Sequence, residues 1–197
     1  MKQETFTEQE AFRLIEQTIQ SVRQNVGENG FIFLLWGWMI LLGYALSYAL
    51  VIFKNPNVIG YCWLVIGVLG FTISFIHYAR KDKQSRVKNQ IEKYFTYVWS
   101  GVGLGALIFY TYLILIQEWG LIAPFVLSMA GIGTFISGRI MKVRALVLGG
   151  ISFWIGTAIA LYFQNEWQFL IGGACMITGY LIPGYVLKFR YKKEQNA

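Results

Sequence analysis

The sequence predicts an all-helical membrane protein with six transmembrane helices, arranged as three helical hairpins and preceded by a cytoplasmic amphipathic helix. Three observations predict this class. Apolar residues make up 56% of the 197 residues. Only 14% are charged, against about a quarter in an ordinary soluble domain. The charged residues also gather between long apolar runs, so the net charge of +7 indicates orientation in a bilayer, and we expect no nucleic-acid binding.

Residues 7–26 have the pattern of an amphipathic helix that lies ahead of the first span. Apolar residues, among them Leu14 and Ile15, recur at helical spacing, and Gly27 is the expected end of the helix. The polar face is mixed and slightly acidic, whereas helices that bind anionic membranes usually carry a face rich in Lys and Arg. This pattern favours docking on a protein partner, with Leu14 and Ile15 as candidate contacts. We treat residues 1–30 as a cytoplasmic helix and linker.

Six apolar runs follow, each close to the length of about 20 residues that crosses a hydrocarbon core. None of them contains Asp, Glu, Lys or Arg. They cover residues 31–53, 59–78, 94–116, 120–137, 145–163 and 169–187. Together they predict a transmembrane domain over residues 31–187, with a basic tail over residues 188–197.

The distribution of basic residues predicts the orientation of the chain. Residues 80–93 carry six Lys and Arg against two acids. Lys54 is the only cation in the links after spans one, three and five, while the other two links and the tail hold thirteen. Because positive loops stay in the cytoplasm, both termini are expected there. The candidate contacts with a partner or with anionic lipid in this loop are Lys81, Lys83, Arg86 and Lys88; topology alone also explains a basic inner loop.

A recurring pattern indicates that the three hairpins are related. The second span of each pair contains a similar string, namely GFTIS from Gly70, GTFIS from Gly133 and GYLIP from Gly179. The first spans contain WG, WSG and WIG, which begin at Trp36, Trp99 and Trp154. Each pair would cross in, out and in again, so the units would be parallel repeats.

The segment from Glu8 to Trp38 carries a resemblance. A polar helix containing EAFRLIEQTIQ, a short Gly and Asn break, and then FIFLLWGW at the start of the first span resemble a group of small uncharacterised bacterial multi-span membrane proteins. The resemblance covers about the first quarter of the chain. It implies a bacterial cytoplasmic (inner) membrane, and it implies no activity and no site residue.

The residues that carry chemistry form no catalytic constellation. His77 is the only histidine, and no span holds a carboxylate that could relay a proton, so an interfacial histidine is favoured over a proton-driven switch. Cys62 and Cys175 lie inside apolar runs and are expected to be buried free thiols. We therefore predict no metal site, no cofactor and no enzymatic activity.

Two sets of small residues lie at helix-packing spacing. Gly101, Gly103 and Gly105 contain a GxxxG motif, and Ser152, Gly156 and Ala160 form a similar ridge. Such a ridge is either a dimerisation face or a groove for packing within the chain. We favour the second reading for both, because a six-span bundle needs such grooves in any case.

Proline inside the last span marks a candidate hinge at Gly179, Pro183 and Gly184. Proline removes a backbone donor and loosens the helix around it. A gating hinge and a static bend are both compatible with this pattern, and the static bend is favoured because neighbouring helices readily satisfy the freed carbonyl.

Two functional hypotheses follow. The preferred one is a non-enzymatic accessory or regulatory membrane protein that contacts a partner through its cytoplasmic helix and loop. The candidate partners are another protein and a second copy of the chain. The alternative is a carrier or channel for a neutral or amphipathic small solute, which would use the bundle interior and the break in the last span. An enzyme acting on lipid would need polar groups converging around His77 and Arg80, and the sequence supplies no partner for them.

Overall fold

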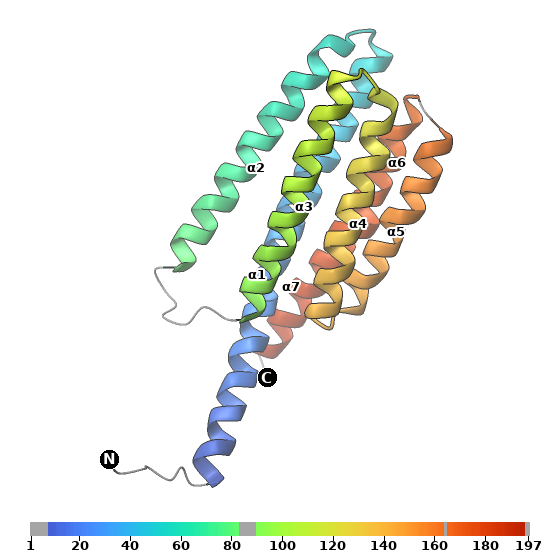
Figure 1. The fold of residues 1–197 in the computed structure, drawn as a ribbon. Helices are drawn as coiled ribbons and strands as arrows, with labels where there is room; N and C mark the ends of the chain where they lie inside the picture. The colour runs from blue at the N-terminus through green and yellow to red at the C-terminus, as the bar shows by residue number, and fades with distance from the viewer. Residues whose placement is uncertain (1–7, 83–89, 164, 196–197) are drawn as a thin grey trace.

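The structure is a computed structural model that describes residues 8–82, 90–163 and 165–195. Over these residues the chain forms helices joined by short turns, with no strand, which confirms the predicted all-helical class. Six of the helices are long and apolar enough to cross a membrane (Figure 1). The elements are α1 (Glu8–Ile52), η1 (Pro56–Val58), α2 (Ile59–Asp82), α3 (Gln90–Leu115), η2 (Trp119–Leu121), α4 (Ile122–Ile140), α5 (Arg144–Tyr162), α6 (Trp167–Met176), η3 (Ile177–Leu181) and α7 (Ile182–Gln195).

Helix α1 corrects one prediction, because it runs through Gly27 without a break. A glycine that ends a helix usually adopts a positive φ, and no glycine in the described part of the chain does so. A glycine inside a helix costs only about 1 kcal/mol relative to alanine, and the long span that follows continues the helix across it. The predicted amphipathic face, with Leu14 and Ile15, lies outside the described side chains and stays a prediction.

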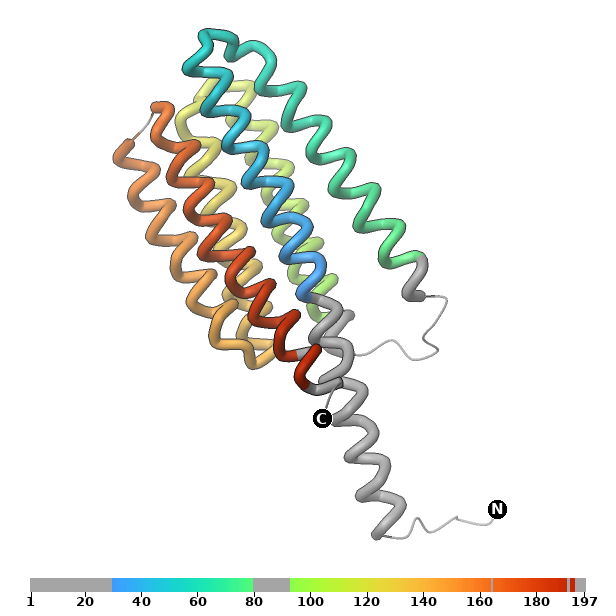
Figure 2. The backbone as a smooth tube through the Cα atoms, turned by 180° about the vertical axis from the view of Figure 1, so that it is seen from behind, coloured from blue at the N-terminus to red at the C-terminus, as the bar shows by residue number. Residues whose placement is uncertain are grey.

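The bundle divides into a packed body and a periphery. The body consists of α1, α4, α5 and the long last helix formed by α6, η3 and α7, and Figures 1 and 2 show these elements side by side. Helix α2 packs on α1, and α3 packs chiefly on α4. Only 11% of the α2 span and 6% of the α3 span are buried, compared with 33% of the α4 span and 56% of the last one. Helices α2 and α3 therefore present most of their surface outward.

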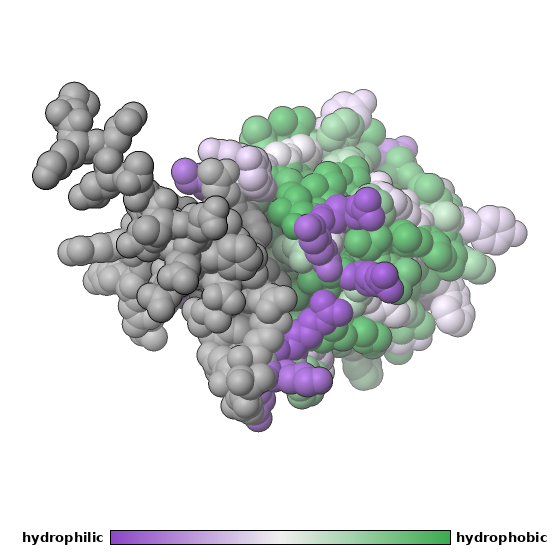
Figure 3. All heavy atoms as spheres, turned by 90° about the horizontal axis from the view of Figure 1, so that it is seen from below, coloured by the Kyte–Doolittle hydropathy of each residue, from purple (hydrophilic) through white to green (hydrophobic). Residues whose placement is uncertain are grey.

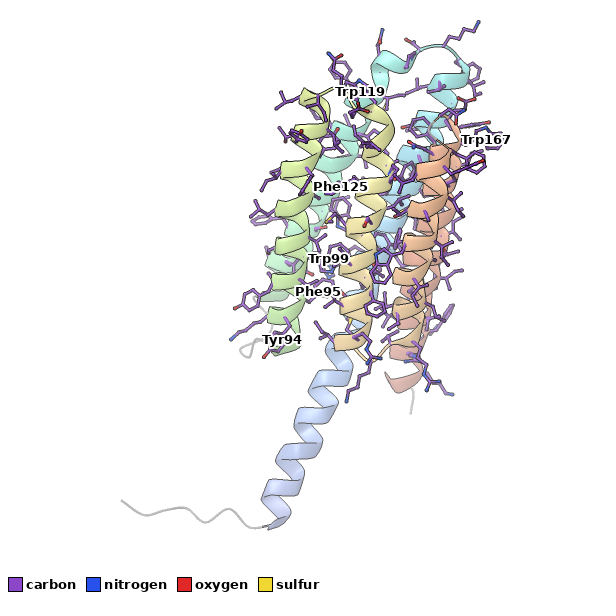
Figure 4. The ribbon with its side chains drawn as sticks, turned by 45° about the vertical axis from the view of Figure 1, so that its right-hand side comes forward. Tyr94, Phe95, Trp99, Trp119, Phe125 and Trp167 are labelled. Carbon is purple, nitrogen blue, oxygen red and sulfur yellow. The ribbon has the colours of Figure 1, made fainter. Side chains whose placement is uncertain are left out.

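Basic residues mark one end of the bundle, which we call the basic end. Arg139, Lys142 and Arg144 lie at or near the turn between α4 and α5, and α7 carries Lys188 and Arg190; all five are exposed. Figure 3, which views the molecule from below, shows hydrophilic side chains gathered there against an otherwise apolar surface. At the opposite end, Figure 4 shows Trp119 and Trp167, as expected for aromatic residues at a membrane interface.

The turns between α1 and α2 and between α3 and α4 have the same backbone structure. In both, a residue with positive φ follows the first helix, with φ of 56° at Lys54 and 61° at Gln117. A short 3₁₀ helix then leads into the second helix. The hydrogen bonds also correspond, from Asn55 N to Leu50 O at 2.8 Å and from Glu118 N to Leu113 O at 3.0 Å. Every corresponding pair of residues is 63 positions apart in the sequence.

The last helix changes its hydrogen bonding where proline was noted. Pro183 has no N–H, so the carbonyl of Gly179 lacks its usual donor four residues later. Residues Ile177–Leu181 form a π-helical segment, in which Ile182 N donates to Ile177 O. The sequence thus located the interruption correctly, and whether it acts as a hinge stays a prediction.

Candidate functional site

Five aromatic residues meet where α1, α3, α5 and η3 come together, and we call them the aromatic cluster. They are Phe33, Phe95, Trp99, Phe153 and Tyr180, and their ring centroids lie 5.1 to 6.4 Å apart. Most pairs meet edge to face, the geometry that aromatic quadrupoles favour. Figure 4 shows Phe95 and Trp99 between α3 and α4. Because these rings fill the junction between four elements, the cluster serves as packing core.

Aromatic rings also lie against glycines in the paired helices. The ring of Trp36 would approach a Cβ on Gly70 to 2.9 Å, and the ring of Trp99 would approach one on Gly133 to 3.2 Å. In the second pair the indole Nε1 of Trp99 also donates to Ser137 Oγ at 3.1 Å. The glycines thus let a large ring cross from one helix onto the backbone of the next.

The third hairpin departs from this contact pattern. The ring that lies against Gly179 belongs to Phe153, whereas Trp154 packs against Gly131 and Phe135 on α4. Helix α5 faces α6 on one side and α4 on the other, so adjacent aromatic residues point toward different helices. In this hairpin the ring on the glycine therefore comes from the residue before the tryptophan.

Buried polar side chains tie helices together. Ser47 donates to Gly43 O at 2.8 Å and accepts from Trp63 Nε1 at 3.0 Å, which joins α1 to α2. Gln168 donates from Nε2 to Gly120 O at 2.7 Å and to Ala160 O at 2.9 Å. Unsatisfied polar groups are costly in a bilayer, so these bonds stabilise the bundle. Among the described side chains one buried polar atom lacks a partner, Ser74 Oγ.

The two small-residue ridges behave differently. Gly156 lies against Cys175, and Ala160 is fully buried, so the α5 ridge packs within the chain as predicted. On α3, a Cβ added at Gly101, Gly103 or Gly105 would meet nothing within 4 Å. The prediction of packing within the chain is therefore wrong for α3. The same spacing of small residues produces one closed ridge and one open face, and sequence alone could not separate them.

The remaining chemistry-bearing residues stand apart. His77 stacks on Phe31 with centroids 4.4 Å apart and contacts Tyr78 edge-on. Both cysteines are free; Cys175 is buried and Cys62 is partly buried. Within residues 8–82, 90–163 and 165–195, no group of three or more His, Cys, Asp or Glu is placed to hold a metal ion.

The predicted contact and hinge residues divide into two groups. Lys83, Arg86 and Lys88 lie outside the described residues, as does the side chain of Lys81, so their contacts stay predictions. The hinge residues are packed closely. Pro183 is buried, a Cβ on Gly149 would lie 2.8 Å from Gly179 O, and one on Gly184 would lie 2.9 Å from the side chain of Leu34.

Comparison with protein-family models, curated proteins and solved structures finds no match for the chain. The class of the protein is defined by its fold and composition alone: a helical protein with six helices long and apolar enough to cross a membrane. The most distinctive unassigned surface of its described part is the open face of α3.

Proposed function

We propose that the protein is a non-enzymatic accessory or regulatory protein of the bacterial cytoplasmic membrane, with both termini in the cytoplasm, which binds a transmembrane helix of a partner protein. The observation that carries the proposal is the open face of α3, where Gly101 and Gly105 have no neighbour within 4 Å. Helices associate in bilayers mainly by close packing, and small residues four apart permit the closest approach.

The equivalent positions in the first hairpin support this reading. We propose that the three hairpins are parallel repeats, and the 63-residue offset aligns Gly101 with Trp38 and Gly105 with Leu42. Trp38 is 48% exposed and Leu42 is 53% exposed, so this hairpin presents bulky apolar groups at the same positions. Lipid contact does not require glycine, and a helical glycine costs about 1 kcal/mol. A second helix that needs the space accounts for the two glycines at these positions of α3.

The surroundings of the two glycines form a continuous helix face. Ile108 and Tyr112 follow Gly105 at intervals of three and four residues, so they lie above it on the same side of α3. Both side chains are exposed, which gives an apolar ridge beside the glycine groove. The basic segment with Lys81, Lys83, Arg86 and Lys88 directly precedes α3, so a partner on this face would also lie near that segment.

Photo-crosslinking in native membranes tests the proposal. A diazirine amino acid placed at Leu104 or Ile108, beside the groove, is expected to give a discrete protein adduct, and one at the exposed Ile155 on α5 is not. The double substitution Gly101→Ile and Gly105→Ile should abolish the adduct because it fills the groove. Ile155→Leu with Ile159→Leu is the matched control and should leave it intact. Adducts with lipid alone at all positions would contradict the proposal, and an adduct of two chains would identify the partner as a second copy.

A second candidate is a carrier for a neutral or amphipathic solute, favoured by the π-helical segment at Ile177–Leu181. Such segments occur frequently at functional sites. If this segment gates a path, Pro183→Ala, which restores the missing donor, should abolish glycerol flux into proteoliposomes measured by light scattering. Flux that is no faster than in empty liposomes, with or without Pro183, would eliminate a path for small neutral solutes such as glycerol.

A further inference from the structure

The second hairpin provides a template for the first at three corresponding positions. Trp36 and Trp99, Gly70 and Gly133, and Ser74 and Ser137 are each 63 residues apart. The intervening turns share this offset and the same hydrogen bonds. In both hairpins the tryptophan ring lies against the glycine of the second helix. The two hairpins can therefore be compared at the serine that lies one helical turn after this glycine, Ser74 in the first hairpin and Ser137 in the second.

At that residue the hairpins differ. Ser137 Oγ accepts the indole N–H of Trp99 at 3.1 Å and is fully buried. Ser74 Oγ is also shielded from solvent, yet it has no hydrogen-bond partner among the described residues. A buried hydroxyl without a partner is destabilising, above all inside a bilayer. The Trp36 ring lies between Gly70 and the edge-on ring of Phe71, with ring centroids 5.1 Å apart.

The packing of the two second helices explains why they differ. Helix α4 packs against both α5 and α3, whereas α2 has α1 as its principal neighbour. Figures 1 and 2 show α2 diverging from α1 toward Asp82. A helix with few buried contacts moves at low cost. Around Ser74, α2 contacts α1 through two ring pairs, Phe71 with Trp36 at 5.1 Å and His77 with Phe31 at 4.4 Å between centroids, so a movement of α2 here has to shift these ring contacts.

We infer that α2 has two positions, an open one as described above and a closed one in which Trp36 Nε1 donates to Ser74 Oγ as Trp99 does to Ser137. The Trp63 to Ser47 bond near the opposite end of α2 is made in both and serves as the pivot. Closing moves the Asp82 end of α2 toward α1.

Pulsed electron spin resonance on the full chain in lipid bilayers tests this inference. Spin labels replace Ile76 on α2 and Arg139 on α4, both exposed, in a Cys62→Ala, Cys175→Ala background. Two label distances are expected. Ser74→Ala and Trp36→Phe should each lower the ratio of the closed to the open population about fivefold, the factor that corresponds to one hydrogen bond of typical net strength. Ser74→Thr, which keeps the hydroxyl, should retain both distances.

Thr72→Ala is the matched control, because Thr72 is exposed on α2 and donates only to Val68 O of its own helix at 2.7 Å; it should leave the ratio unchanged. The alternative to two positions of α2 is that the Ser74 hydroxyl donates to the Gly70 carbonyl within α2, as the Ser47 hydroxyl does to the Gly43 carbonyl. In that case Ser74→Ala changes nothing. A single distance in the parent protein, or a ratio that Ser74→Ala and Trp36→Phe leave unchanged, overturns the inference.

Discussion

The small-residue faces of α5 and α3 have nearly the same sequence spacing and opposite environments. On α5, Gly156 lies against Cys175 of α6, and Ala160, four residues later, is fully buried. On α3, Gly101 and Gly105 face open space. Packing within the body accounts for the small residues on α5, whereas no packing within the described chain accounts for the glycines on α3. This contrast shows that a small-residue motif indicates a capacity for close packing, and that only the surrounding helices decide whether the chain itself uses it.

The largest expected effect lies on the side of α5 that packs against α4. A Cβ on Gly150 would lie 2.7 Å from the backbone nitrogen of Phe135, so Gly150→Leu forces α4 and α5 apart. Overpacking of this kind typically costs about 1–3 kcal/mol and occasionally more, and we expect the upper end because the obstacle is backbone. Thermal unfolding in detergent measures the loss. Gly103→Leu on α3, where an added Cβ would meet nothing within 4 Å, is the control, and an equal loss there would remove the distinction between the packed and the open glycines.

The next effect concerns Gln168, which links α6 to η2 and α5 at the end of the bundle opposite the basic end. Gln168→Leu removes two hydrogen bonds, to Gly120 O and Ala160 O, and leaves both carbonyls without this donor. We expect a loss of about 1–3 kcal/mol, the usual cost of unsatisfied buried groups. Thr111→Val on α3 removes only a bond within its own helix, to Leu107 O, and should change the unfolding midpoint far less.

On the open face, bulk should be tolerated. Gly101→Ile with Gly105→Ile fills space that the chain leaves empty, and isoleucine is a better helix former than glycine. The free energy of unfolding of the purified protein should therefore stay unchanged or rise by less than about 1 kcal/mol. A marked loss of stability in the purified protein would show that α3 packs within the chain after all.

The smallest effect tests a polar contact on the closed ridge. Ser152 Oγ and Thr178 Oγ1 lie 3.0 Å apart between α5 and η3. Interhelical hydrogen bonds of this type in bilayers average about 0.6 kcal/mol, so Ser152→Ala should lower stability by about that amount. Thr178→Ala should give a similar loss, and the double variant should lose less than the sum, since both substitutions remove one shared contact.

The sequence predicted the features that depend on composition and local chemistry. Six apolar runs predicted six spans, and Pro183 predicted an interruption because a missing donor acts wherever it occurs. Gly27 was assigned as a helix end, yet glycine ends a helix only when the following chain departs from it. The choice of Phe153 over Trp154 against Gly179, and the open state of Gly101, depend on which helix lies opposite. That information is tertiary and has no local signal.

The corresponding turns after α1 and α3 were missed for a different reason. Their strings FKNPNV and IQEWGL share no obvious residue pattern. Both nevertheless place a non-glycine residue at positive φ, Lys54 in one and Gln117 in the other, and continue through a 3₁₀ helix. Since many sequences adopt the same turn, a search by residue identity cannot find it. The constant offset of 63 between the tryptophan, glycine and serine positions was the signal available in the sequence.

The most direct test of the claim that a partner covers the open face of α3 needs no substitution. A lipid-soluble diazirine reagent labels residues that contact lipid, and mass spectrometry locates the labelled positions. We predict that Leu104 and Ile108 are labelled much less than Ile155 in native membranes, and as strongly as Ile155 after purification into lipid, since all three are exposed in the isolated chain. Equal labelling of α3 and α5 in native membranes would contradict the claim, because it would show that lipid alone contacts the glycine face.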